Sequence, residues 1–428
     1  MPSPQPASPP RAELPESGRV SSEAQSLYAR SRPYLVQIRT LLNGQGSQSS
    51  VGSGFLVEDG HRIITNYHVV SQVALEPQRY RLTYSHVDGR QGQLQLLAVD
   101  VVHDLAVLAP VVPAGASVAR EGLRFRAVQQ AMRQGEHIYS LGNPLDVGFA
   151  VVEGTYNGLV ERSHIPNIFF SGSLNPGMSG GPALDAQGQV IGVNVATRLD
   201  GQQVSFLVPA EHAVALLSSS RKASPVTAPM YPEITRQLMS YQAGLTKRFL
   251  GLPWRASGDA RYRIPVPQEV FMRCWGSSTP ADSKGLQFER SECGMNQAVF
   301  VGGFLQTGNI SMRHEIYDGR RLGAWRFAHQ LSESLSNEGF AGGRSRTPAQ
   351  CTQRFIDAQG LPMRAVVCMS AYKKFSGLYD LSVLAMSADS EQYGVLGRFD
   401  ARGVAFDNAM RLADSYLKGF GWTTPPSR

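Results

Sequence analysis

A glycine-rich turn around a single serine constrains this chain more than any other segment does. The sequence NPGMSGGP occupies residues 175–182. Such a turn can present the hydroxyl of Ser179 as a nucleophile. It can also direct the backbone N–H groups of Gly177 and Ser179 at one point, where negative charge on an oxygen atom would develop. Because glycine turns that contain serine are common, the signal becomes strong only with matching partners elsewhere in the chain.

Two upstream segments supply those partners. The sequence TNYHVV at residues 65–70 follows a glycine-containing turn between apolar stretches, which predicts a β-hairpin that ends at His68. In the second segment, Asp104 opens an apolar strand-like run. A serine hydroxyl needs a neutral imidazole to take its proton and a carboxylate to orient that imidazole. The chain order His68, Asp104, Ser179 is the order found on the trypsin-type double barrel.

With these segments the chain resembles the trypsin-like serine peptidases, and among them the bacterial HtrA (Deg) group. The resemblance covers roughly residues 27–218. It implies two six-stranded antiparallel barrels, a mainly β fold, with the active site in the cleft between them. The matching segments are GSGF at 52–55, TNYHVV at 65–70, DLAVL at 104–108, LGNP at 141–144, NPGMSGGP at 175–182 and GVN at 192–194.

The resemblance also implies a role for each residue of the site. Ser179 would be the nucleophile, His68 the general base and Asp104 the acid that orients the base. The backbone of Gly177, Met178 and Ser179 would form the oxyanion hole.

The specificity pocket follows from the same fold, in which the segment before the serine and the strand after it form the pocket wall. The stretches 171–174 and 192–196 contain neither Asp nor Glu. A buried Lys or Arg side chain would lack a neutralising partner there, so we expect small or medium aliphatic side chains instead. The candidate pocket residues are Ser173, Leu174, Val193, Asn194 and Val195.

Composition excludes several other classes of function. The 428 residues are enough for two or three domains, and 42% of them are hydrophobic. The net charge of +7 comes from scattered residues and basic pairs rather than from a long basic run, so we expect no nucleic-acid partner. The sequence contains no zinc-ligand pattern, phosphate-binding glycine loop or calcium-binding loop, so we expect neither a metal nor a cofactor.

The first 26 residues are rich in Pro and Ser, which predicts a disordered leader. They lack the apolar core of a signal peptide, and no later run is long enough to span a membrane. The resembled family usually works outside the cytoplasm, so we expect a periplasmic or otherwise extracytoplasmic location, with the cytoplasm as the alternative. Its members are often trimers built through N-terminal contacts. This leader has no aromatic trimer motif, which favours a monomer.

After the predicted protease domain at 27–218, the composition changes. Residues 219–261 begin with a Ser-, Ala- and Pro-rich linker, and the spacing of apolar residues predicts a connecting helix at about 231–249. Residues 262–422 do not resemble the PDZ domain that usually follows in the HtrA group. We predict an α+β accessory or regulatory domain there, followed by a tail at 423–428.

This predicted C-terminal domain contains two stretches with the same order of elements. The first has two cysteines, strand-like runs at 298–305 and 310–317 and a helix near 322–335. The second has two cysteines, strand-like runs at 364–371 and 379–386 and a helix near 404–420. We therefore expect an internal duplication.

The duplication favours disulfides between Cys274 and Cys293 and between Cys351 and Cys368, although four cysteines allow three pairings and could also remain reduced. Each bond would close a loop of about 20 residues, which stabilises a fold by about 3 kcal/mol in the chain-entropy model. Disulfides would indicate an oxidising compartment.

These observations together predict a serine endopeptidase that hydrolyses protein or peptide substrates through an acyl-enzyme, in protein quality control or processing. The C-terminal domain would recruit substrate, gate the cleft or anchor the enzyme. Two alternatives remain open. One is a binding or chaperone-like protein whose triad is misassembled. The other is a partner-docking scaffold in which the C-terminal domain carries the function.

Overall fold

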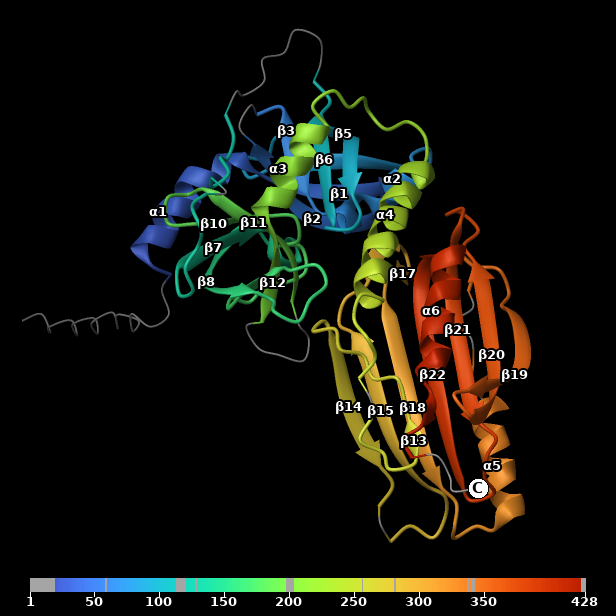
Figure 1. Cartoon of the computed structure of the whole chain (residues 1–428). Helices are drawn as coiled ribbons and strands as arrows, with labels where there is room; N and C mark the ends of the chain where they lie inside the picture. Colours follow the sequence, from blue (N-terminus) through green and yellow to red (C-terminus); the bar gives the residue numbers. More distant parts are fainter. Residues whose placement is uncertain are drawn as a thin grey trace, which may run out of the picture.

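The fold consists of two closed six-stranded barrels and a long seven-stranded sheet, and a helix lies between the barrels and the sheet (Figure 1). All strand pairs of both barrels are antiparallel, which confirms the predicted double barrel. The computed structural model describes residues 20–57, 60–112, 121–127, 129–197, 204–255, 257–280, 282–336, 339 and 343–424.

The first barrel has the strand order β1-β2-β3-β6-β5-β4. Its strands are rich in Val, Ile and Leu, whose side chains alternate between the barrel interior and its surroundings. Helix α2 (Tyr67–Leu75) follows β3 and packs its apolar side chains on the barrel core. The strands are β1 (Leu35–Leu42), β2 (Gln48–Val57), β3 (Arg62–Thr65), β4 (Tyr80–His86), β5 (Gln91–Asp100) and β6 (Leu105–Pro110).

The second barrel has the order β10-β11-β12-β9-β8-β7. Short 3₁₀ helices precede β1 at Arg32–Tyr34 and follow β7 at Pro144–Asp146. The strands are β7 (His137–Gly142), β8 (Ala150–Leu159), β9 (Ile168–Phe170), β10 (Pro182–Leu184), β11 (Val190–Thr197) and β12 (Ser205–Pro209).

Helix α1 (Ser22–Ser31) packs on this second barrel. Ser21 caps the helix by accepting a hydrogen bond from the Ala24 amide, and the Tyr139 hydroxyl donates to Glu23 at 2.9 Å. The predicted leader was therefore too long at its C-terminal end, because residues 22–26 are helical. Residues 1–19 of that leader lie outside the described part of the chain.

Helix α4 (Tyr231–Phe249) joins the barrels to the sheet (Figure 1). Its N-terminal half packs Ile234 and Leu238 into the core of the first barrel. Its C-terminal half packs Leu245 and Phe249 into the core of the sheet. The connection from α3 (Ala210–Ser219) lies along the first barrel, since the Val226 amide donates to the Leu96 carbonyl at 2.8 Å.

The C-terminal sheet has the order β14-β15-β18-β22-β21-β20-β19, and two helices cover its opposite faces. Neighbouring residues on β22 show this, because Val395 packs with α6 and Leu396 packs with α5. The elements are β14 (Met272–Ser278), β15 (Gln287–Met295), β18 (Ile310–Asp318), α5 (Ala324–Ser336), β19 (Gln350–Ala358), β20 (Leu361–Ala371), β21 (Leu378–Ser387), β22 (Tyr393–Ala405) and α6 (Phe406–Lys418). A small sheet pairs β13 (Tyr262–Arg263) with β23 (Gly421–Trp422).

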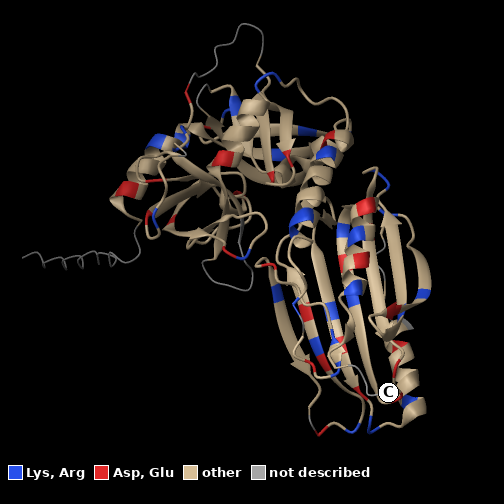
Figure 2. Cartoon of the chain, viewed as in Figure 1, with Lys and Arg blue, Asp and Glu red and all other residues tan. Residues whose placement is uncertain are grey.

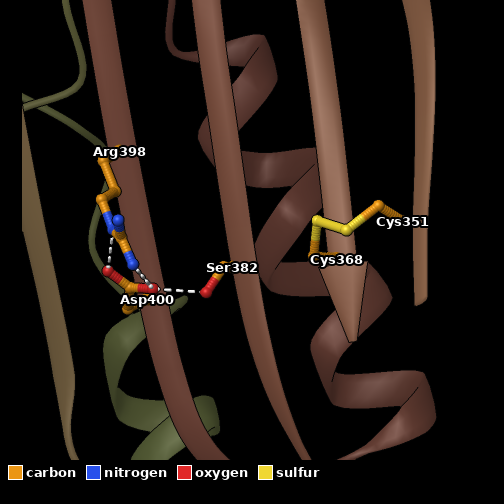
Figure 3. The surroundings of a disulfide bond; sticks show 5 residues. All are labelled: Cys351, Cys368, Ser382, Arg398 and Asp400. Atoms are coloured by element: carbon orange, nitrogen blue, oxygen red, sulfur yellow. Dashed lines mark hydrogen bonds and ion pairs between the residues drawn. A yellow bond between two sulfur atoms is a disulfide. The ribbon is translucent and has the colours of Figure 1, made fainter. Parts of the chain in front are cut away.

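A disulfide links each edge strand of this sheet to its inner neighbour. Cys274–Cys293 joins β14 to β15, and Cys351–Cys368 joins β19 to β20, so the expected disulfides are present. In Figure 3, Ser382 and Asp400 lie on the two strands beside the second bond, and Arg398 pairs with Asp400 at 2.6 Å. Edge strands have one unpaired side, so a covalent link to the inner neighbour limits their fraying.

The two units of this region begin and end alike but differ in the middle. Each begins with a disulfide-linked hairpin and ends with a strand and a helix. The second unit has β21 between these parts, inside the sheet. The first unit has a separate hairpin, β16 (Val299–Gly302) and β17 (Leu305–Thr307), outside the sheet. The strand predicted at 298–305 was therefore wrong, because a turn at Gly303 and Phe304 divides it.

Basic and acidic residues are interspersed over the barrels and the sheet (Figure 2). This distribution agrees with the scattered positive charge of the sequence. Among the described residues, no helix is both long and apolar enough to cross a membrane.

Candidate active site

His68 and Asp104 form a pair with two direct contacts. His68 lies in the first turn of α2, not at the end of a hairpin strand as the sequence pattern predicted. The two carboxylate oxygens of Asp104 bind separate atoms of His68: the ring Nδ1 at 2.7 Å and the backbone N–H at 2.8 Å. Asp104 has φ +56°, a left-handed conformation that Asp tolerates better than most residues. The pair is therefore fixed in both side chain and backbone.

Opposing effects set the pKa of His68. Burial lowers the pKa of this imidazole, because the charged form loses hydration. The charge of Asp104 and its hydrogen bond raise the pKa, and together they exceed the effect of burial. The pKa of His68 is therefore above its usual value, and the ring becomes a neutral base only above that raised pKa.

Ser179 lies at the junction of the two barrels. Its carbonyl accepts a hydrogen bond from the backbone N–H of Ser53 on β2, at 2.8 Å. Its hydroxyl donates to the carbonyl of Val195 on β11, at 3.3 Å, which is long for an O–H···O bond. The hydroxyl is therefore held weakly, and it points to β11 rather than to His68.

Two backbone amides beside Ser179 are open for an oxyanion. Within the described residues, the N–H groups of Gly177 and Ser179 donate no hydrogen bond. The Met178 N–H instead donates to the Asn175 carbonyl at 3.0 Å, so its inclusion among the oxyanion donors was wrong. The Pro176 carbonyl, which belongs to the peptide before Gly177, accepts a hydrogen bond from the Leu145 N–H at 2.7 Å. A trans peptide points its N–H away from its carbonyl, so this bond sets the direction of the Gly177 N–H.

Two glycines of the NPGMSGGP turn are required by close contacts. Gly177 has φ +94°, and a Cβ there would lie 2.4 Å from the Asn143 carbonyl oxygen. Gly180 has φ +85°, and a Cβ there would lie 2.3 Å from the Ser53 carbonyl oxygen. Both positions need a left-handed backbone and a hydrogen atom in place of a side chain. The local sequence is thus fixed by the approach of neighbouring loops.

Comparisons with known proteins agree with this geometry. Residues 52–193 match the model of the trypsin-like peptidase domain. The chain contains a trypsin-like peptidase domain of the HtrA type. HhoA of Synechocystis sp. is 30% identical over 244 residues, which is 55% of this chain and 57% of HhoA. The serine protease Do-like HtrA of Bacillus subtilis is 26% identical over 318 residues, 70% of this chain and 64% of that protein.

A third relative is the DegP-like periplasmic serine endoprotease of Marinomonas sp. It is 28% identical over 196 residues, which cover 43% of this chain and 38% of that protein. The chain thus spans less than two thirds of the length of each of these three relatives.

Ser53 is a residue of the HtrA-type domain that the sequence analysis missed. Its side chain is 1% exposed. The Ser53 hydroxyl donates to the Gly177 carbonyl at 2.7 Å and accepts from the Asn143 N–H at 2.9 Å. It therefore ties β2 of the first barrel to two loops of the second. A serine between two glycines, in the sequence GSGF, was the available signal.

Asp146 holds the loop that orients Gly177. Leu145 and Asp146 both have left-handed backbones, with φ +52° and +60°. The Asp146 carboxylate accepts from the Gln37 amide at 2.5 Å and from Arg39 at 2.9 and 3.1 Å. Gln37 and Arg39 belong to β1, so the first barrel again supports the oxyanion loop of the second. Nothing in the sequence near Asp146 indicates these distant partners.

The predicted pocket residues of the HtrA-type domain are not all available to a substrate. The side chains of Leu174, Val193 and Asn194 are at most 7% exposed and fill the barrel cores. Asn194 also bonds to Ser140 and to the carbonyls of Leu141 and Met178, so its polar atoms are already paired. Predicting these three as pocket-lining side chains was therefore wrong. Ser173 is exposed, and Val195 lies beside the Ser179 hydroxyl.

No group of three or more His, Cys, Asp or Glu side chains that could hold a metal ion occurs within the described ranges. The ionisable residues that could assist Ser179 in a reaction are His68 and Asp104. The HtrA-type domain therefore offers acid–base and nucleophilic groups for chemistry.

Proposed function

We propose that this protein is a serine endopeptidase that hydrolyses peptide bonds of protein substrates through an acyl-enzyme. One observation carries the proposal. Asp104 and His68, which are joined by two hydrogen bonds, and the open amides of Gly177 and Ser179 all lie at the junction between the barrels. These are the groups that acyl transfer needs: an oriented base, a nucleophile and donors for the oxyanion.

The reaction begins with a rotation of the Ser179 hydroxyl from the Val195 carbonyl toward Nε2 of His68. His68 takes the hydroxyl proton while Oγ attacks the carbonyl carbon of the substrate. Asp104 accepts a hydrogen bond from Nδ1, which keeps Nε2 free to act as the base. The same carboxylate stabilises the imidazolium that forms.

The substrate carbonyl oxygen becomes negatively charged and is bound by the amides of Gly177 and Ser179. His68 then gives its proton to the leaving amine, the peptide C–N bond breaks and Ser179 is acylated. Water attacks this ester with His68 again as the base. Release of the acid product restores the hydroxyl of Ser179.

We further propose that the protein works outside the cytoplasm, in protein quality control or processing. Disulfides persist in oxidising compartments, and the bonds at Cys274 and Cys351 support such a location. The relative from Marinomonas sp. has a name that places it in the periplasm. Cleavage next to small or medium aliphatic side chains remains a prediction.

Labelling by a fluorophosphonate probe tests the proposal, because such probes phosphonylate only an activated serine. We expect the purified full chain to label and the Ser179→Ala variant to remain unlabelled. A fluorogenic peptide with an aliphatic residue before the scissile bond should be hydrolysed by the wild type only. Equal signals from both proteins would refute the assignment of Ser179.

A second candidate function is binding without cleavage, as in a chaperone-like protein. The contact of the Ser179 hydroxyl with Val195, rather than with His68, favours it. In that case the wild type would not label but would still suppress aggregation of an unfolded client protein. The Ser179→Ala variant would then be indistinguishable from the wild type in both assays.

A further inference from the structure

We propose that Phe300, which lies on β16 outside the peptidase domain, is a positioning residue for His68. The inference rests on the proposed function and adds a residue from the C-terminal half to the site. Phe300 would hold the imidazole in the orientation in which Nε2 faces Ser179.

Phe300 contacts two aromatic rings at the start of α2. Its ring centroid is 6.3 Å from that of His68, and the two ring planes meet at 87°. The Tyr67 ring is also 6.3 Å away, at 61°. Edge-to-face pairs at this separation attract each other beyond their simple burial. The hairpin thus contacts the general base and the residue directly before it.

A hydrogen bond fixes the same hairpin to the same turn. The Tyr67 hydroxyl donates to the carbonyl of Val301 at 2.6 Å, and the Tyr67 side chain is fully buried. Apolar residues on either side extend this contact. Val299, Val301 and Leu305 are buried in one continuous core with the first barrel. The position of Phe300 is therefore defined by its neighbours rather than by its own contact alone.

The segment that leads into the hairpin is attached to the second barrel. Gln297 accepts from the Ile165 N–H at 3.2 Å and donates to the Ile165 carbonyl at 2.8 Å. Ile165 lies in the connection between β8 and β9. Residues 297–305 therefore contact both barrels. A segment that positions a residue of a site between the barrels needs such contacts.

The physical need for such a residue follows from how His68 is held. Among the described residues, one hydrogen bond, from Nδ1 to Asp104, holds the ring itself, because the other contact of Asp104 is to the backbone. With Cγ held by the main chain and Nδ1 by Asp104, small changes of χ1 and χ2 can still tilt the ring and displace Nε2. A second ring packed against its flank removes this freedom, and a base must be held closely in place to act on a serine hydroxyl.

The test compares kcat and KM of full-length variants on one fluorogenic peptide. We expect Phe300→Ala to lower kcat about tenfold, which corresponds to about 1.4 kcal/mol of transition-state stabilisation, with KM changed less than twofold. Phe300→Tyr keeps the ring and should keep most of the activity. The matched control is Phe304→Ala, because Phe304 lies at the turn of the same hairpin and is fully exposed.

A second variant guards against a general loss of fold. Tyr67→Phe removes only the hydroxyl that binds the Val301 carbonyl, so it should loosen the hairpin and lower kcat severalfold, with far-UV circular dichroism unchanged. Unchanged kcat in Phe300→Ala would overturn the proposal. A higher kcat in that variant would also overturn it and would identify the hairpin as a barrier to substrate.

The labelling assay separates this inference from the proposed function. If the wild type does not react with the fluorophosphonate probe, the peptidase function fails, and the role of Phe300 fails with it. If the wild type reacts and Phe300→Ala reacts at the same rate, only the role of Phe300 is refuted.

Discussion

The substitution Asp146→Ala should weaken the oxyanion hole although Asp146 touches neither Ser179 nor His68. The carboxylate holds a left-handed turn in which the Leu145 N–H binds the Pro176 carbonyl. That bond directs the Gly177 N–H toward the position of the oxyanion. Without the carboxylate, the turn can relax, and the peptide before Gly177 can rotate away.

The magnitude follows from a balance of two effects. Two L-residues with left-handed backbones cost about 2–4 kcal/mol together. The bond from the buried Gln37 amide to a carboxylate stabilises the turn by about 1.5–3 kcal/mol. Arg39 and Asp146 are 28% and 42% exposed, so solvent screening limits their pair to about 1 kcal/mol or less. These effects nearly cancel, so losing about 2 kcal/mol would lower the ratio of the productive to the relaxed turn about 30-fold.

The assay is the second-order rate of fluorophosphonate labelling, measured together with kcat on a peptide. We expect both to fall about 10- to 100-fold in Asp146→Ala, because complete loss of one oxyanion donor sets the upper limit at about 10²–10³. Asp146→Asn keeps an acceptor for Gln37 and tolerates the left-handed backbone, so it should lose fivefold at most. Leu145→Gly removes strain and should be at least as active as the wild type.

The reasoning is refuted if Asp146→Ala labels as fast as the wild type. The pH dependence gives an independent check. The bonds from Gln37 and Arg39 lower the pKa of Asp146, so its stabilising effect is present above the ordinary Asp range and is lost only as pH falls through the lowered pKa. A loss of activity near neutral pH therefore cannot come from Asp146.

Three further predictions concern other parts of the molecule. The pKa of His68 is raised, so kcat/KM should increase with pH through a midpoint above about 6.5. The stability that the charge of His68 contributes is lost over the same pH interval. A midpoint below about 6 in a pH–rate profile would contradict this prediction. Ser53→Ala leaves the buried Gly177 carbonyl without its hydroxyl donor, at about 1–3 kcal/mol, and labelling should fall at least tenfold, which an unchanged rate would disprove. Joint replacement of Cys351 and Cys368 by Ser should destabilise the sheet by about 3 kcal/mol, seen as a lower denaturant midpoint, and reductant should lower that midpoint further only through the remaining Cys274–Cys293 bond.

The sequence predicted the barrels, and it brought together His68, Asp104 and Ser179 as candidates, because both signals are encoded locally. The turn around Ser179 needs glycines at fixed positions, and those glycines are visible without a structure. His68 and Asp104 follow from short runs of defined composition. The same local reasoning failed for the secondary structure at His68, because the apolar run HVV fits a strand as well as the first turn of a helix.

Pocket residues were mispredicted for a different reason. Alternation along a strand says which residues share a face but not whether that face meets a cleft or a core. Val193 and Asn194 are neighbours, yet both are enclosed, because Asn194 satisfies its polar atoms within the barrel. Burial of a polar side chain depends on partners from distant strands, and a single sequence does not list them.

The residues that act and the residues that hold them are encoded in different ways. Ser179 and His68 need particular side-chain chemistry, so they are recognisable in sequence. Ser53, Asp146 and Phe300 need only the right neighbours, and these neighbours are distant in sequence: the Gly177 loop for Ser53, β1 for Asp146 and the start of α2 for Phe300. The hairpin is also the segment that breaks the repeat of the C-terminal sheet, since the second unit keeps β21 inside the sheet. Because β16 and β17 lie outside the sheet, their apolar side chains are buried against another surface, which includes the helix that carries His68. The hairpin of β16 and β17 therefore joins the C-terminal half directly to the helix that carries His68.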